Sequence, residues 1–141
     1  EYAARSKGKA MQYAGTNHSD SLSKYAFTAS SHLANPQIVG SLKPNKAGLF
    51  DMSGNVYEWI GAYYQYYEDP STWHNLEESS MRIIRGGSIG GYPGFAQTYW
   101  RVGVLGKAQE YDIGFRCAVT QEELNSQRFL GGFFHSKPIR P

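Results

Sequence analysis

The chain has very little cysteine: Cys117 is the single cysteine among 141 residues. One thiol excludes an internal disulfide framework and zinc sites built from several cysteines. No apolar run approaches the length of a membrane-spanning helix, so we expect no membrane insertion. The formal net charge is only +2, and the lysines and arginines are scattered. Because nucleic-acid binders usually carry a basic face or stripe, we expect no nucleic-acid partner.

Recognisable catalytic motifs are also missing. None of the four histidines lies at metal-ligand spacing from another histidine or from a carboxylate, and the motif H-E-x-x-H does not occur. Cys117 falls in DIGFRCAVT (112–120), which we predict to be a buried strand with Ile113, Phe115, Cys117 and Val119 on one face. A buried thiol has a raised pKa and behaves as a small hydrophobic group. The sequence therefore offers no catalytic residue.

Aromatic residues make up 15% of the chain, and there are 16 glycines. This composition is not that of a disordered chain, and the length suits one domain, 1–141, with a core of its own. We predict an α+β fold with short irregular strands, few helices and many loops. Its expected elements are a helical start at 1–5, strands at 37–42, 56–64, 81–85 and 112–120, and long loops at 15–36 and 65–80.

The glycine-rich stretch RGGSIGG (85–91) has two interpretations. Glycine turns can aim backbone N–H groups at phosphate. A P-loop also requires Lys-Ser/Thr after its glycines and a helix behind them, and this stretch has neither. We interpret the glycines as a tight turn leaving the strand at 81–85, where a side chain would clash.

The stretch DMSGNVYEW (51–59) gathers hard oxygen ligands. Asp51, Asn55 and Glu58 lie within one turn-rich segment, and backbone carbonyls near Gly54 and Val56 would complete a calcium shell. The spacing is not that of an EF-hand loop. The alternative is that Asp51 and Asn55 only satisfy amides of the turn. The residues themselves leave both interpretations open.

Between the glycine turn and GFR, residues 89–111 combine aromatic residues with glycines and follow neither a helical nor a strand period. Such segments are typical of loop-borne binding surfaces, where rigid aromatic rings supply contact area at low entropy cost. The alternative is that part of the cluster fills the core, with Trp100 as the first candidate.

Four blocks carry a family resemblance. EYAAR (1–5), NKAGLFDMSGNVYEW (45–59), RIIRGGS (82–88) and GFRCA (114–118) resemble, in order and spacing, the formylglycine-generating-enzyme or sulfatase-modifying-factor domain. The resemblance implies a C-type-lectin-like fold. It also implies a structural calcium held by the side chains of Asp51 and Glu58 and the carbonyls of Gly54 and Val56.

Formylglycine-generating enzymes use copper and a cysteine pair placed after GGS to oxidise a sulfatase cysteine. In this chain the corresponding segment, IGGYPGFAQTYWR (89–101), contains no cysteine. We therefore expect no copper and no such catalysis. The alternative, a formylglycine-generating-enzyme-like oxidoreductase or a degenerate remnant of one, requires residues from a partner chain or a different chemistry.

A second branch with this fold is similar in character: the variable proteins of diversity-generating retroelements. The resemblance implies a scaffold at 1–88 and 112–120 that displays a ligand-binding segment at 89–111. The ligand would be a protein or glycan on a host or target surface, which implies an extracellular or virion location. The tail at 121–141 either packs on its own domain, giving a monomer, or mediates assembly, and a purely structural role is a third hypothesis. The candidate ligand-binding residues are Gly90, Gly91, Tyr92, Gly94, Phe95, Trp100, Val102, Val104, Leu105, Glu110 and Tyr111.

Overall fold

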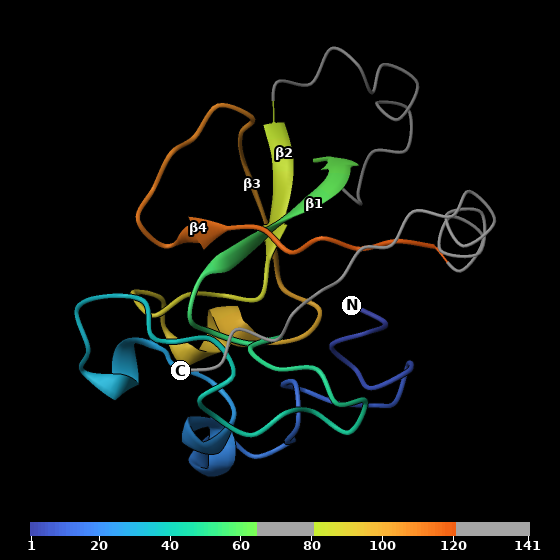
Figure 1. The fold of residues 1–141 in the computed structure, drawn as a ribbon, viewed down its shortest axis with the longest axis vertical. Coiled ribbons are helices and arrows are strands. Elements are labelled where there is room, and N and C mark those ends of the chain that lie inside the picture. Colours follow the sequence, from blue (N-terminus) through green and yellow to red (C-terminus); the bar gives the residue numbers. More distant parts are fainter. Residues whose placement is uncertain (65–80, 121–141) are drawn as a thin grey trace, which may run out of the picture.

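The computed structural model describes residues 1–64 and 81–120 (Figure 1). The predicted loop at 65–80 and the predicted tail at 121–141 lie outside the described residues. The described part holds short 3-10 helices and strands within extensive loops, which is the predicted α+β character. None of its helices has the length and apolar character needed to cross a membrane. The elements are η1 (Ser19–Lys24), η2 (Ala29–Ser31), β1 (Tyr57–Tyr63), β2 (Met81–Arg85), η4 (Pro93–Ala96), β3 (Arg101–Leu105) and β4 (Ile113–Gly114).

The strands form one sheet in the order β3-β2-β1-β4. β2 pairs antiparallel with both β1 and β3, whereas β4 pairs parallel with the start of β1. The register of β1 against β2 shifts between Trp59 and Tyr63, so β1 is irregular along its length. In Figure 1 the sheet occupies one end of the molecule, and the loops of the first half of the chain occupy the other.

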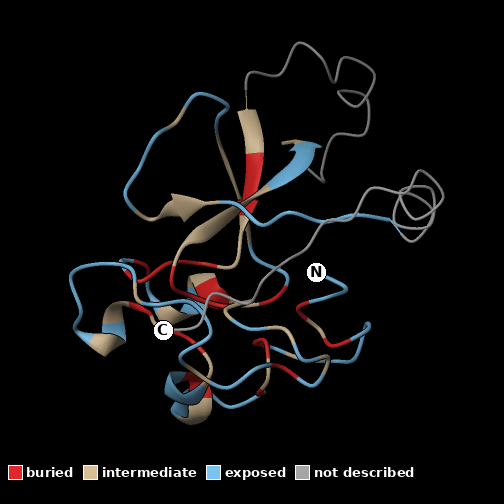
Figure 2. Ribbon diagram, in the orientation of Figure 1, coloured by how far each residue is buried: buried red, intermediate tan, exposed pale blue. Residues whose placement is uncertain are grey.

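The buried apolar residues are divided between these two parts (Figure 2). In the sheet, Ile83 and Ile84 of β2 are buried. The loop region comprises residues 1–56. There Tyr13, Leu22 and Ala26 form a cluster with Ala96 of η4. η4 is therefore packed against the first 26 residues of the chain, and its position depends on them.

Two of the predicted strands are corrected by the structure. At 37–42 there is no strand, and Ile38 and Val39 are 83% and 77% exposed. The strand predicted over 112–120 is confined to β4, and Phe115 is 78% exposed. Within the described residues, the pairing of β4 with β1 covers Tyr57 and Glu58, and the ladder ends there.

Two further predictions are also corrected. Cys117 is exposed rather than a buried core thiol, since it lies beyond the end of β4. The helical start at 1–5 is one turn, with Arg5 N–H donating to the Glu1 carbonyl (2.9 Å). Ser6 and Lys7 follow with positive φ, a conformation that ends a right-handed helix.

Candidate ligand-binding site

The segment that follows β2 begins with the paired glycines. Gly86 and Gly87 have φ of 96° and 73°, the left-handed region that glycine adopts without strain. A Cβ on Gly87 would lie 2.8 Å from backbone atoms of Ala96. The two glycines therefore form the predicted tight turn, and Gly87 also lets the segment fold closely onto η4.

Three consecutive residues of the loop region hold this segment in place. The Gly54 N–H donates to the Gly86 carbonyl (2.7 Å), and the Asn55 carbonyl accepts from the Ile89 N–H (2.8 Å). Ser53 is fully buried, and its hydroxyl donates to the Ala96 carbonyl (2.7 Å). We call Ser53–Asn55 the tripod. It fixes residues 86–96 at three points that span the turn, the start of the aromatic segment and η4.

Within 89–111, buried residues alternate irregularly with exposed ones. Ile89, Gly91, Ala96 and Thr98 are buried and anchor the backbone. Tyr92 is 74% exposed and Tyr111 is 63% exposed. Gly90, Gly94, Leu105, Glu110 and Trp100 are exposed as well, and Phe95 is half-buried.

Three aromatic side chains form a continuous cluster on this segment. Tyr92 meets Phe95 edge-on, with ring centroids 6.2 Å apart, and Phe95 meets Trp100 at 5.2 Å. Phe95 belongs to η4, which Pro93 begins and Tyr92 caps. Trp100 is thus at the surface rather than in the core, and Phe95 contacts both exposed rings. Tyr99, exposed beside Trp100, was not among the predicted site residues although it belongs to the same aromatic run.

Tyr111 connects the far end of the segment to its beginning. A Cβ placed on Gly90 would lie 2.6 Å from the Tyr111 hydroxyl, so Tyr111 covers Gly90 directly. A side chain at this position would therefore require the exposed Tyr111 ring to move. The backbone at Gly94 is open instead, with nothing within 4 Å of an added Cβ.

The remaining predicted residues occupy the sheet. Three of them are in β3 and pair with residues of β2. Val102 pairs with Ile84, Val104 with Arg82, and Leu105 with Met81. Val102 and Val104 are half-buried. The structure thus joins Tyr92, Phe95 and Trp100 in one cluster and Gly90 with Tyr111. It places Val102 and Val104 in β3, where they pair with β2.

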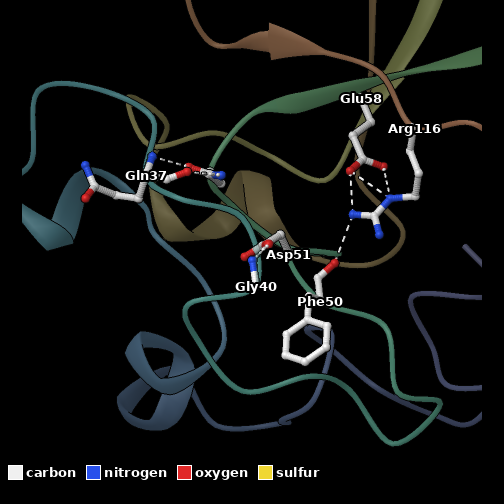
Figure 3. A network of polar contacts seen from close by, with 7 residues as sticks. Gln37, Gly40, Phe50, Asp51, Glu58 and Arg116 are labelled. Atoms are coloured by element: carbon white, nitrogen blue, oxygen red, sulfur yellow. Dashed lines mark hydrogen bonds and ion pairs between the residues drawn. The ribbon is translucent and has the colours of Figure 1, made fainter. Parts of the chain in front are cut away.

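The four predicted calcium ligands line one pocket of about 440 Å³. Asp51, Gly54, Val56 and Glu58 share its wall with Arg116. Figure 3 shows how the two carboxylates are engaged: Asp51 Oδ2 accepts from the Gly40 N–H (2.7 Å), and Glu58 faces Arg116.

Arg116 already supplies the positive charge in this pocket. Its Nη2 lies 2.6 Å from Glu58 Oε1, and its Nε donates to both carboxylate oxygens. Nη2 also donates to the Phe50 carbonyl (2.9 Å). The hydrogen bond to Glu58 raises the pKa of Arg116 against the opposing effect of partial burial, and the charges of Glu58 and Asp51 raise it further.

A calcium ion needs free carboxylate oxygens, and the Glu58 oxygens are committed to Arg116. In this arrangement the donors do not suit calcium. Among the residues that the structure describes, no group of three or more histidine, cysteine, aspartate or glutamate side chains is placed to hold a metal ion. Calcium at Asp51, Gly54, Val56 and Glu58 stays a prediction from the sequence, and the ion pair between Glu58 and Arg116 argues against it. Arg116 was absent from the predicted site, although the GFR block that contains it carried part of the family resemblance.

Comparison with known proteins identifies the family. Residues 1–121 match the sulfatase-modifying factor enzyme 1-like domain. The formylglycine-generating enzyme of Streptomyces coelicolor is 32% identical over 88 residues, covering 57% of this chain and 28% of that protein. The chaperone protein LppX of Paenibacillus barcinonensis is 30% identical over 103 residues, covering 62% of this chain and 34% of that protein.

Solved structures show the same fold. Variable protein 1 of Treponema denticola superposes with a TM-score of 0.70 at 29% identity, over 81% of this chain and 42% of that one. PvdO of Pseudomonas aeruginosa superposes with a TM-score of 0.63 at 30% identity, over 81% of this chain and 47% of that one. The chain spans less than half the length of each of these relatives. The chain belongs to the sulfatase-modifying factor enzyme 1-like family, and its described residues have a C-type-lectin-like fold.

Proposed function

We propose that this chain is a non-catalytic ligand-binding module that recognises its target through residues 89–111, as a variable protein of a diversity-generating retroelement does. One observation carries the proposal: exposed tyrosines project from a backbone that is fixed at several buried points. Tyr92 and Tyr111 are exposed, while Ile89 and Ala96 beside them are buried and bonded to the tripod.

This arrangement has a physical advantage for binding. A ligand that meets an already ordered segment loses less conformational entropy on association than one that must order a loop. Exposed tyrosine and tryptophan rings are the side chains that most often dominate binding energy. The similarity to the Treponema denticola variable protein supports the same interpretation. The target would be a protein or a glycan on a cell or virion surface.

Binding to arrayed targets tests the proposal. The full chain would be applied to a printed array of purified surface proteins and surface glycans, and any target that binds would be titrated by surface plasmon resonance. The double variant Tyr92→Ala/Tyr111→Ala should weaken binding by roughly 30-fold or more, since each anchor contributes about 1–2 kcal/mol. The control Tyr2→Ala removes an exposed tyrosine outside the segment and should leave affinity unchanged.

Binding that survives the loss of both Tyr92 and Tyr111 would contradict the site assignment, provided that circular dichroism shows both variants folded. The flanking DNA gives a second test of the retroelement relationship. A reverse transcriptase gene and a near-copy of codons 85–116 beside this gene are expected. If the flanking DNA lacks both, the retroelement relationship is wrong, and the proposal is reduced to a binding module.

The similarity to the Streptomyces coelicolor enzyme favours one alternative, oxidation of a sulfatase cysteine to formylglycine. That chemistry uses a pair of cysteines in the family, and this chain has only Cys117. We expect no conversion when the protein is incubated with copper, oxygen and a sulfatase-type peptide. A mass change of the peptide cysteine to formylglycine would establish the enzyme instead.

A further inference from the structure

A second hollow lies beside the aromatic cluster, on the side of the loop region. It has a volume of about 250 Å³ and lies between η1, η2 and the first residue of η4. Its wall is rich in hydroxyl groups. Those that matter here come from Ser19, Ser23, Thr28, Ser30 and Ser31, and the single charged side chain in the wall is Asp20.

Three of the hydroxyls make hydrogen bonds within the wall. The Ser19 hydroxyl donates to Asp20 Oδ1 (3.4 Å). The Thr28 side chain accepts from the Ser31 N–H, and the Ser31 hydroxyl accepts from the Thr28 N–H (3.2 Å). This reciprocal pair fixes the geometry of η2. The Ser23 and Ser30 side chains are exposed, and neither hydroxyl makes a hydrogen bond to another described residue. Their donors and acceptors therefore remain available to a ligand.

The floor of the hollow is apolar. Leu22 and Ala26 are buried there, and the Pro93 ring forms the rim next to exposed Tyr92. The Ala29 N–H donates to the Gly91 carbonyl (2.9 Å), which ties η2 to the aromatic segment directly beside that rim. The hollow and the ligand-binding face are consequently one continuous, fixed surface.

This combination suits a sugar ring. A pyranose presents hydroxyl groups at its edge and C–H groups on its face, which match the serine wall and the apolar floor. The volume is below the roughly 300–1,000 Å³ of pockets that hold drug-sized ligands, so a single ring fits. Asp20 accepts hydrogen bonds from sugar hydroxyls but repels a carboxylate, which disfavours acidic sugars.

We propose that this hollow binds one neutral sugar ring, a hexose or an N-acetylhexosamine, at the end of a surface glycan. The inference deepens the proposed binding function and rests on it, because the sugar would occupy one edge of the face that carries Tyr92. Binding uses side-chain hydroxyls and Asp20, so it does not require calcium.

Titration by nuclear magnetic resonance tests this proposal. The full ¹⁵N-labelled chain would be titrated with the methyl pyranosides of glucose, galactose and mannose and with N-acetylglucosamine and N-acetylgalactosamine, in EDTA. At least one sugar should bind with millimolar affinity and shift amides within 19–31 and at Tyr92. Sialic acid is the acidic control and should cause no such shifts.

The variant Ser23→Ala/Ser30→Ala should weaken the bound sugar about tenfold, the loss expected for two hydrogen bonds to neutral groups. Ser41→Ala is the matched control, an exposed serine outside the hollow. The proposal is overturned if no neutral sugar shifts these amides, or if the affinity survives the double variant. The two proposals can fail separately. If a neutral sugar shifts these amides but no target depends on Tyr92 and Tyr111, only the proposed binding function of residues 89–111 is refuted. If a target depends on the two tyrosines but no sugar shifts these amides, only the sugar site in the hollow is refuted.

Discussion

The loop region at 1–56 and the sheet formed by β1–β4 are stabilised in different ways. In the sheet, strand ladders satisfy the backbone polar groups, and β2 contributes buried isoleucines. In the loop region, buried polar side chains perform that task. Asn45 donates to the Ala3 and Ala4 carbonyls, and Asn55 exchanges two hydrogen bonds with the Gln37 backbone.

The difference determines where the protein is sensitive. A ladder is formed by backbone groups that any residue except proline supplies, so a strand tolerates a change of side chain better. A side chain that satisfies buried backbone groups has no such substitute. The candidate binding segment depends on both kinds of support within the tripod: Gly54 and Asn55 hold it through backbone groups, and Ser53 holds it through its side chain.

The largest effect is expected at Gly54, the centre of the tripod. Its φ is +74°, and an added Cβ would lie 2.2 Å from the Phe27 carbonyl oxygen. Gly54→Ala should therefore lower the free energy of unfolding by about 3–5 kcal/mol in urea denaturation. Gly48→Ala is the matched control, since Gly48 has φ of +80° but nothing within 4 Å of a Cβ. It should cost only about 1 kcal/mol, and equal losses would show that steric contact at Gly54 is unimportant.

A smaller loss is expected from Ser53→Ala. The Ser53 hydroxyl accepts from the Ala14 N–H (3.1 Å) and donates to the Ala96 carbonyl, so its removal leaves two buried groups without partners. We expect about 2–3 kcal/mol by thermal and urea unfolding. Ser88→Ala provides the comparison, because the Ser88 hydroxyl is equally buried but has no partner among the described residues. That variant should stay within about 0.5 kcal/mol of the wild type. A loss at Ser88 as large as at Ser53 would contradict the tripod.

The junction between the two regions should show a smaller effect still. Arg116 reaches from the end of β4 to Glu58 of β1 and to the Phe50 carbonyl of the loop region. Arg116→Lys keeps the charge but loses the planar fork, so about 1 kcal/mol is expected in urea denaturation. Arg5→Lys alters a more exposed ion pair with Glu1 and should cost less than about 0.5 kcal/mol. A larger loss of stability at Arg5 than at Arg116 would contradict a stabilising role for the Arg116 contacts.

The smallest effect is expected from calcium. Because Arg116 occupies the Glu58 carboxylate, millimolar calcium should leave the Tm of the wild type unchanged relative to EDTA. Magnesium serves as the ionic-strength control in the same thermal scans. A calcium-specific rise in Tm would restore the predicted site at Asp51, Gly54, Val56 and Glu58.

Much of the fold could be predicted because its cues are local or carried by the family blocks. RIIRGGS specified β2 and the glycine turn, and the four blocks specified the C-type-lectin-like fold. The grouping of Asp51 with Glu58 followed from their proximity in the chain. The Arg116 partner of Glu58 could not be predicted, because 58 residues separate them and only the parallel pairing of β4 with β1 brings them together.

Local patterns failed where no tertiary partner existed. Ile38–Val39 and Phe115 look like buried strand residues, yet no neighbouring strand or layer covers them among the described residues. Conversely, the serine-rich stretch at 19–31 has no periodic signal. Its hollow forms where η1 and η2 meet Pro93, a residue more than 60 positions away in the chain.

The family, the glycine turn and the aromatic character of 89–111 could be predicted from the sequence, because they depend on residue type and near spacing. Which aromatic rings are exposed, which carboxylate is neutralised and which three residues hold the segment became known from the three-dimensional contacts. Those properties depend on contacts between residues far apart in the chain, and such contacts leave no local pattern to read.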